Sequence, residues 1–173
     1  MKIFRSEKEK KEERMREMTY NNLQDFSFDG KEMLAKILDV YDGDTIITTI
    51  KVEDTYYKIH CRLSGIDTPE LKTEDEDERV AAKEARNHLI ELLTGQKMRK
   101  EVTRKEIQVM CANINSVVNV RCFHNDKYGR TLVEIIKDGI NINKKMIDDG
   151  YAGVYDGKIK TNWTTYYKVK SYY

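Results

Sequence analysis

Three runs of strand-type residues follow one another with only a few residues between them, and this spacing restricts the chain to a small set of folds. MLAKILDVY (33–41) is rich in apolar residues, TIITTIKV (45–52) is rich in β-branched residues, and YYKIHCRL (56–63) completes the series. The tripeptide DGD (42–44) supplies turn residues between the first two runs. Strands joined this tightly pair as neighbours, so the sequence predicts a β-meander.

The pattern then becomes helical. RVAAKEARNHLIELL (79–93) places apolar side chains at intervals of three and four residues, and Gly95 is a suitable residue for ending a helix. VVNVRCF (117–123) and TLVEIIK (131–137) predict a second strand pair, and INKKMIDDG (142–150) predicts a short helix. This order of elements predicts an α+β fold, a small β-barrel with helices packed outside it.

Residues 1–30 mix charges of both signs with few apolar residues, which predicts a charged N-terminal arm, helical or disordered. Residues 31–173 are then expected to form a single domain. Within it, the basic stretch 97–105 is open to two interpretations, a phosphate-contact surface or a solvated strand or loop. Neither residues 97–115 nor residues 159–173 are assigned to an element.

Composition limits the partners and the compartment. The formal net charge is only +1, so overall charge does not indicate a nucleic-acid partner, and any such binding would need local patches. The N-terminus lacks the apolar segment of a secretion signal, and no apolar run reaches membrane-spanning length. The three cysteines lack the spacing of a disulfide framework. We therefore expect an intracellular protein with reduced thiols, without a membrane or obligate protein partner.

Two aspartates are candidates for a metal site. Asp44 ends the tight turn after the first strand, and Asp67 follows the third strand. A meander brings its turns and strand ends together, and calcium prefers oxygen ligands that include two or more carboxylates. Each aspartate taken alone is also explained as an ordinary turn residue.

Two arginines and one glutamate are candidates for chemistry on a phosphate. Arg62 lies five residues before Asp67, and Arg130 begins a strand. Guanidinium groups bind phosphate oxygens bidentately and stabilise charge that develops on phosphorus. Glu70 lies close enough in sequence to orient a water molecule. Each could equally be a solvated surface residue.

A zinc site built from His60, Cys61, Cys122 and His124 is a weaker alternative. These residues lie in two predicted strands, but their spacing does not match known zinc fingers. Strand alternation also sends neighbouring residues to opposite faces. Buried thiols are the simpler interpretation.

The motifs become informative when they are taken in order. DGDT (42–45), RLSGIDTPE (62–70) and DKYGR (126–130) stand in an order and internal spacing that closely resemble the staphylococcal nuclease family, over residues 33–155. The resemblance implies a five-stranded barrel of OB type with helices around it. It also implies a calcium-dependent nuclease that hydrolyses phosphodiesters of DNA, RNA or both and leaves 3′-phosphate products.

The resemblance implies a role for nine residues. Six form the catalytic centre, namely the calcium ligands Asp44, Asp67 and Thr68 (the last through its backbone carbonyl), the phosphate-binding Arg62 and Arg130, and Glu70, which acts on the attacking water. Three contact the substrate, namely Lys127, Tyr128 and Tyr155. Pro69 fixes the backbone between the metal ligands and Glu70.

Two departures from the family pattern leave a second function open. LKTEDEDER (71–79) is acidic where the family carries a lysine-bearing loop, and residues 156–173 show no clear counterpart of the family's last helix. A catalytically silent barrel that binds nucleic acid or protein is therefore the alternative. Retention of all five charged site residues favours the enzyme, because uncompensated carboxylates in a cleft cost stability.

Overall fold

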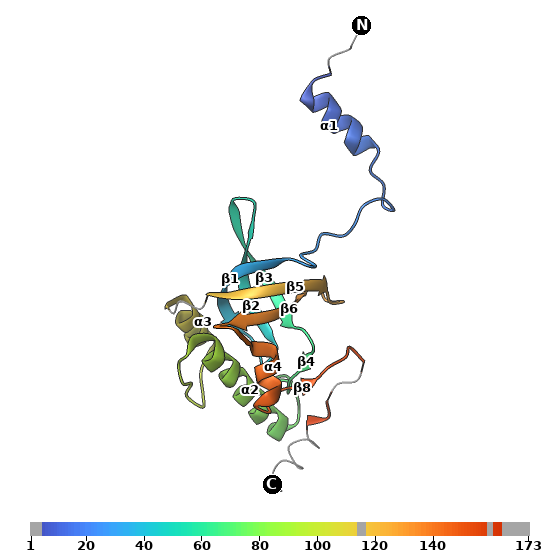
Figure 1. The fold of residues 1–173 in the computed structure, drawn as a ribbon. Helices are drawn as coiled ribbons and strands as arrows, with labels where there is room; N and C mark the ends of the chain where they lie inside the picture. Colours follow the sequence, from blue (N-terminus) through green and yellow to red (C-terminus); the bar gives the residue numbers. More distant parts are fainter. Residues whose placement is uncertain (1–4, 114–116, 159–160, 164–173) are drawn as a thin grey trace.

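A computed structural model describes residues 5–113, 117–158 and 161–163 of the chain. In this part a barrel of long strands forms the centre (Figure 1), namely β1 (Glu32–Val40), β2 (Thr45–Val52), β3 (Thr55–Leu63), β5 (Val117–Asn125) and β6 (Thr131–Lys137). The strand order is β3-β2-β1-β5-β6, and parallel pairing of β6 with β3 closes the barrel. The predicted five-stranded OB-type barrel is confirmed.

The predicted meander forms because its turns are short and its strands have one apolar face. The backbone N–H of Tyr41 donates to the carbonyl of Thr45 at 2.9 Å and brackets the turn between β1 and β2. Val52 pairs with Thr55, which leaves only two residues for the turn between β2 and β3. Ile46 and Ile50, both at most 1% exposed, pack into the interior of the barrel.

Three helices of the described chain pack against the barrel (Figure 1), namely α2 (Glu76–Thr94), α3 (Arg104–Asn113) and α4 (Ile142–Asp148). The helices predicted at 79–93 and 142–150 correspond to α2 and α4. The stretch that the sequence left unassigned contains α3, whose Ile107 and Cys111 are fully buried in the core. None of the helices in the described ranges combines the length and apolar content that crossing a membrane requires.

The acidic stretch after Pro69 begins a helix. The Asp75 side chain caps α2 by accepting hydrogen bonds from the N–H groups of Asp77 and Glu78, and Gly95 ends the helix with φ +73°. Acidic side chains in the first turn also interact favourably with the positive end of the helix dipole. Much of the acidity that departs from the family pattern therefore has a local structural reason.

Three further strands in the described chain are only two residues long. β4 (Ile66–Asp67) pairs with β8 (Gly153–Val154), and β7 (Ile140–Asn141) pairs with the end of β6. The β4–β8 pair brings the chain after β3 next to the chain after α4. This contact places Asp67 beside a segment almost ninety residues further along the sequence.

The three cysteines are buried, as the sequence predicts. Cys61 of β3 and Cys122 of β5 point into the barrel core, and Cys111 joins the same core from α3. Burial, with a smaller contribution from Cys122, raises the pKa of Cys61 to about 12. Burial raises the pKa of Cys111 to about 11. These thiols are apolar packing groups in the folded chain.

The N-terminal segment carries one helix outside the barrel, α1 (Glu7–Arg16) (Figure 1). Ser6 and Glu9 form a reciprocal capping box at its start, and ion pairs such as Lys10–Glu7 lie along its surface. None of its residues is buried. The helix therefore depends on local interactions, in contrast to α2.

Candidate active site

A groove of about 1280 Å³ runs along β3 and reaches the turn between β5 and β6. Six of the predicted site residues line it, namely Arg62, Glu70, Lys127, Tyr128, Arg130 and Tyr155. The other three are nearly buried, at 3% exposed for Asp44, 1% for Asp67 and 2% for Thr68. The structure therefore brings all nine predicted residues to one region of the barrel.

The turn that carries Asp44 is packed too tightly for any residue larger than glycine at its centre. A Cβ atom at Gly43 would lie 2.9 Å from the Cβ of Thr68 and 3.0 Å from the Cβ of Ala85 in α2. The N–H of Asp44 also donates to Asp42 Oδ1 at 3.1 Å. The turn is thus fixed against both the DTPE segment and α2.

Arg62 joins the two predicted metal-binding aspartates. Its Nη1 and Nη2 donate to Asp44 Oδ1 and Oδ2, each at 2.9 Å, in a bidentate fork. Its Nη2 also approaches Asp67 Oδ1 at 3.5 Å. The Arg62 side chain is only 10% exposed. The meander brings its turn and strand ends together, so Asp44 and Asp67, 18 and 5 positions from Arg62, meet at its guanidinium.

The other oxygen of Asp67 is held by a segment that the sequence analysis did not assign. The N–H of Thr161 donates to Asp67 Oδ2 at 3.1 Å. The Thr161 side chain packs against Gly153 of β8, the strand that pairs with β4. The chain after α4 therefore closes the site behind Asp67.

Negative charge exceeds positive charge at this buried end of the groove. Burial, and next the neighbouring Asp42 carboxylate, raise the pKa of Asp44 to about 7 although Arg62 opposes the shift. Burial also raises the pKa of Asp42, with a smaller contribution from Glu70. A cation beside these carboxylates would oppose both shifts, because a nearby opposite charge favours the ionised form.

Glu70 is positioned by the first turn of α2. Its backbone N–H donates to Glu78 Oε1 at 3.1 Å, and Glu78 Oε2 accepts from the Thr73 hydroxyl at 2.9 Å. Glu70 itself is half-buried and lines the groove. Glu78 therefore fixes the backbone on which the predicted water-orienting carboxylate stands.

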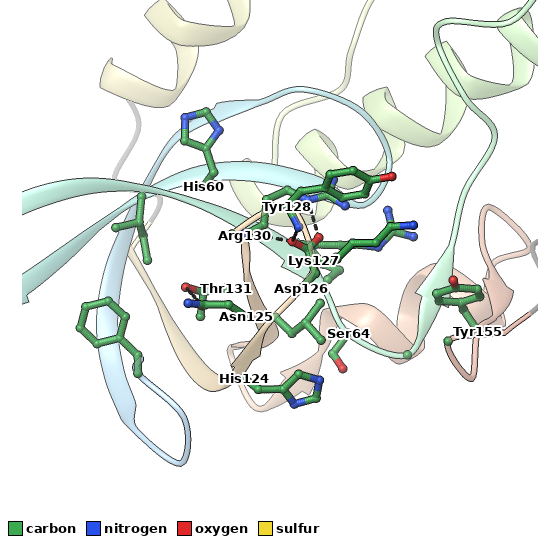
Figure 2. Close-up of a pocket in the computed structure, with 18 of the residues that line it drawn as sticks. His60, Ser64, His124, Asn125, Asp126, Lys127, Tyr128, Arg130, Thr131 and Tyr155 are labelled. Atoms are coloured by element: carbon green, nitrogen blue, oxygen red, sulfur yellow. Dashed lines mark hydrogen bonds and ion pairs between the residues drawn. The ribbon is translucent and has the colours of Figure 1, made fainter. Parts of the chain in front are cut away.

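Arg130 is held by Asp126 in the turn between β5 and β6 (Figure 2). Asp126 Oδ2 accepts from Arg130 Nε at 2.7 Å, and Oδ1 accepts from the N–H groups of Tyr128 and Arg130, both at 2.9 Å. Partial burial alone would raise the pKa of Asp126, but these hydrogen bonds and the charge of Arg130 outweigh it and lower the pKa. Arg130 is 24% exposed and reaches open solvent.

The hydroxyl of Thr45 connects the two arginines. Arg130 Nη1 donates to Thr45 Oγ1 at 3.2 Å, and the same hydroxyl lies 3.0 Å from Asp44 Oδ1, to which it donates. Arg62 holds the same Asp44 oxygen. A continuous chain of polar contacts therefore runs from Arg130 to Arg62.

Aromatic rings flank both guanidinium groups. The centroid of the Tyr128 ring lies 5.6 Å from Arg130 Cζ and 5.1 Å from Lys127 Nζ, and the Tyr155 centroid lies 5.7 Å from Arg62 Cζ. Tyr128 is 73% exposed. These rings offer flat apolar surfaces beside the positive charges, which suits a base attached to a phosphate.

Five contributors to the site were not predicted as site residues, namely Asp42, Thr45, Glu78, Asp126 and Thr161. Asp42 and Asp126 both accept a backbone N–H two residues ahead, a preference of aspartate at turns that the motifs DGD and DKYG already carry. Thr45 belongs to the DGDT motif, but nothing local indicates its contact with Arg130. No feature of the local sequence indicates the contact of Glu78 with the backbone of Glu70 either.

The alternative zinc site is not formed. Cys61 and Cys122 are fully buried in the core, whereas His60 and His124 are exposed. Strand alternation therefore separates the thiols from the imidazoles, as expected. Across the described ranges, no three His, Cys, Asp or Glu side chains are grouped so that they could hold a metal ion.

The predicted calcium ligands still suit a hard cation by their chemistry. They supply two carboxylates and one backbone carbonyl, which are the kinds of oxygen ligand that calcium takes in proteins. Water molecules and phosphate oxygens commonly complete such coordination shells. The residues present therefore fit a divalent cation with oxygen ligands.

Comparison with known proteins gives concordant matches. A family model described as "Staphylococcal nuclease homologue" matches residues 60–172. A thermonuclease of Staphylococcus hyicus is 30% identical over 121 residues, which cover 70% of this chain and 59% of that protein.

Two uncharacterized proteins also match. One from Methanocaldococcus jannaschii is 29% identical over 153 residues, which cover 79% of this chain and 66% of that protein. One from Bacillus anthracis is 33% identical over 118 residues, which cover 68% of this chain and 45% of that protein. The chain thus spans between 45% and 66% of the length of these three relatives.

Proposed function

This chain belongs to the staphylococcal nuclease homologue family, and on that premise we propose that it is a calcium-dependent nuclease that hydrolyses phosphodiesters of DNA, RNA or both. One observation carries the proposal: Arg62 and Arg130 face one groove and are linked through Asp44 and Thr45. Two guanidinium groups in one groove form a binding site for a phosphodiester. The family match begins after Asp44, yet the fold brings Asp44 to the matched Arg62.

The two arginines have complementary tasks in this proposal. Arg130 is partly exposed and can donate to the non-bridging oxygens of an incoming phosphate. Arg62 is fixed by Asp44 and adds positive charge at the buried end of the groove. Together they stabilise the charge that accumulates on phosphorus during attack, which is the main electrostatic requirement of the reaction.

Glu70 orients the attacking water and accepts its proton. An O–P bond forms from water to phosphorus, the bond from phosphorus to the 5′ oxygen breaks, and the leaving oxygen takes up a proton from solvent to become an alcohol. The product then retains a 3′-phosphate. Asp44, Asp67 and the Thr68 carbonyl would hold the calcium ion, which supplies Lewis-acid polarisation of the phosphate.

Cleavage assays test the proposal. Purified protein is incubated with supercoiled plasmid, single-stranded DNA and RNA, first with calcium and then with a calcium chelator. We expect cleavage only with calcium, and a loss of orders of magnitude in Glu70→Gln but not in the exposed control Asp77→Asn. Protein that binds these polymers but never cleaves them, with calcium or magnesium, would support the alternative of a silent binding barrel.

A further inference from the structure

The groove continues beyond the two arginines. Its lining includes Lys58 and His60 of β3, His124 of β5, and Phe26 and Phe28 of the segment before β1. Figure 2 shows His60 and Tyr155 on opposite sides of Arg130 and Lys127. The reaction proposed above uses none of these five residues.

Strand alternation along β3 arranges Lys58, His60 and Arg62 in a row. Ile59, Cys61 and Leu63 are the residues of this strand that pack into the core. Lys58 and His60, both exposed, therefore share the other face with Arg62. Alternate residues of a strand are about 6.6 Å apart, a spacing comparable to that of successive phosphates in an extended polynucleotide.

The acidic residues of the groove lie elsewhere or are already paired. Asp42 and Glu70 belong to the buried end, and Asp126 is bound to Arg130. Asp156 follows Tyr155 at the opposite side of the groove. The part of the groove around Lys58 and His60 is therefore suited to an anion.

An aromatic pair completes this end of the groove. The rings of Phe26 and Phe28 meet edge to face, with centroids 4.9 Å apart. Phe28 packs against the core, and its carbonyl accepts from the N–H of Lys31 at 2.9 Å. Phe26 remains 71% exposed. An anchored segment thus holds one phenyl ring exposed at the rim of a polar groove, where an unpaired base could stack on it.

We propose that Lys58, His60 and Phe26 form a second nucleotide subsite, which binds the nucleotide next to the cleaved phosphodiester in a single-stranded polynucleotide. Lys58 and His60 bind its phosphate, and Phe26 stacks on its base. A duplex would hide that base, so the subsite selects single strands. This inference rests on the proposed function, because it assumes that the substrate is a nucleic acid.

Paired substrates test the subsite by activity. One substrate is a single-stranded octanucleotide, and the other is a mononucleotide with a nitrophenyl leaving group, too short to reach the subsite. In Phe26→Ala and Lys58→Gln, the ratio of kcat/KM on the octanucleotide to that on the mononucleotide should fall about tenfold, because stacking and phosphate contacts are each of that size. Tyr57→Ala and Lys51→Gln, matched exposed residues outside the groove, should leave the ratio unchanged.

Binding tests the same subsite without any activity. Fluorescence anisotropy with labelled single-stranded DNA in chelator measures Kd and its salt dependence. Lys58→Gln should weaken binding and reduce the slope of log K against log salt by about 0.7, the value for one phosphate of a single strand. Unchanged binding and an unchanged slope in both variants would overturn the subsite. A wild type that binds but does not cleave would overturn the proposed function and leave the binding result to decide the subsite.

Discussion

The two halves of the groove hold their arginines in opposite ways. Arg62 is 10% exposed and its guanidinium is bound to Asp44 and Asp67, which are themselves buried. Arg130 is 24% exposed and is held by Asp126 within a single turn. In the first half the contacts come from other parts of the chain, whereas in the second the ion pair lies within one turn and Thr45 of β2 adds one longer contact.

This difference predicts in which half a substitution lowers both stability and catalysis, and in which half it lowers mainly catalysis. Buried ionic groups become costly when one partner is removed, since the remaining charges lose their compensation. A pair that keeps contact with solvent contributes less to stability, because water screens it. The buried half should therefore couple catalysis to folding, and the exposed half should affect catalysis almost alone.

Removal of each arginine gives the largest contrast. Arg62→Ala leaves Asp44 and Asp67 without their guanidinium, so the free energy of unfolding should fall by about 3–5 kcal/mol. Arg130→Ala should lower it less, by about 1–2 kcal/mol, because the pair is only partly buried and Asp126 keeps its two backbone hydrogen bonds. Urea titration followed by circular dichroism in chelator measures both, and activity should fall by orders of magnitude in each variant. Equal losses of stability would remove the distinction between the two halves.

A double variant measures how strongly Arg62 and Asp44 stabilise each other in the buried half. Asp44→Asn removes one of the carboxylates that Arg62 neutralises. The combination of Arg62→Ala with Asp44→Asn should therefore be more stable than the sum of the two single changes predicts. Additive losses would show that the two side chains do not interact energetically.

Calcium should stabilise the folded chain through the buried half alone. A ligand that binds only the native state raises the free energy of unfolding by about 2.7 kcal/mol at a concentration of one hundred times its Kd. Thermal melting with and without calcium measures the shift. Asp44→Asn should abolish it, and Asp126→Asn, a carboxylate of the exposed half, should retain it. A shift that survives in Asp44→Asn would place the calcium elsewhere.

Glu78 tests whether the buried half depends on α2. Glu78→Gln weakens the acceptor of the Glu70 N–H and of the Thr73 hydroxyl, so stability should fall by about 1 kcal/mol. The value of kcat should fall while the affinity for single-stranded DNA changes little, because only the position of Glu70 is disturbed. Asp77→Asn, in the same turn, is the control. A loss of affinity with an unchanged kcat would contradict this role.

The smallest expected effect is the loss of stability at acidic pH that depends on Asp126. Its pKa is lower in the folded chain than its ordinary value of 3.8. The carboxylate therefore contributes stability that is present above about pH 4 and is lost as the pH falls through its folded pKa. Between pH 5 and pH 2 the wild type should lose more stability than Asp126→Asn, measured by urea titration at each pH. Parallel curves would show that the pair with Arg130 is not maintained in solution.

The sequence predicted the parts of this molecule that depend on local spacing. Strand runs, turns and the helix at 79–93 follow from periodicity and turn residues, and the motif residues follow from their order. The contact between Thr161 and Asp67 could not be predicted, because it joins positions 94 residues apart through a β4–β8 pair of only two residues per strand. The role of Thr45 also depended on barrel closure, which brings β6 beside β3.

The domain division at residue 30 and the individual roles of the nine site residues stay predictions. The structure brings these residues to one region of the barrel. The variants of Arg62, Asp44 and Glu78 separate these roles, since each predicts a different combination of stability, calcium response and turnover.

The three buried thiols allow the opening of this fold to be timed. Each thiol is inert while it is packed and becomes accessible to a modifying reagent only when the chain around it opens. Cys61 and Cys122 report on the barrel, and Cys111 reports on α3. If Cys111 is labelled first, α3 detaches before the barrel strands separate. One wild-type chain thus carries its own reporters for two stages of unfolding.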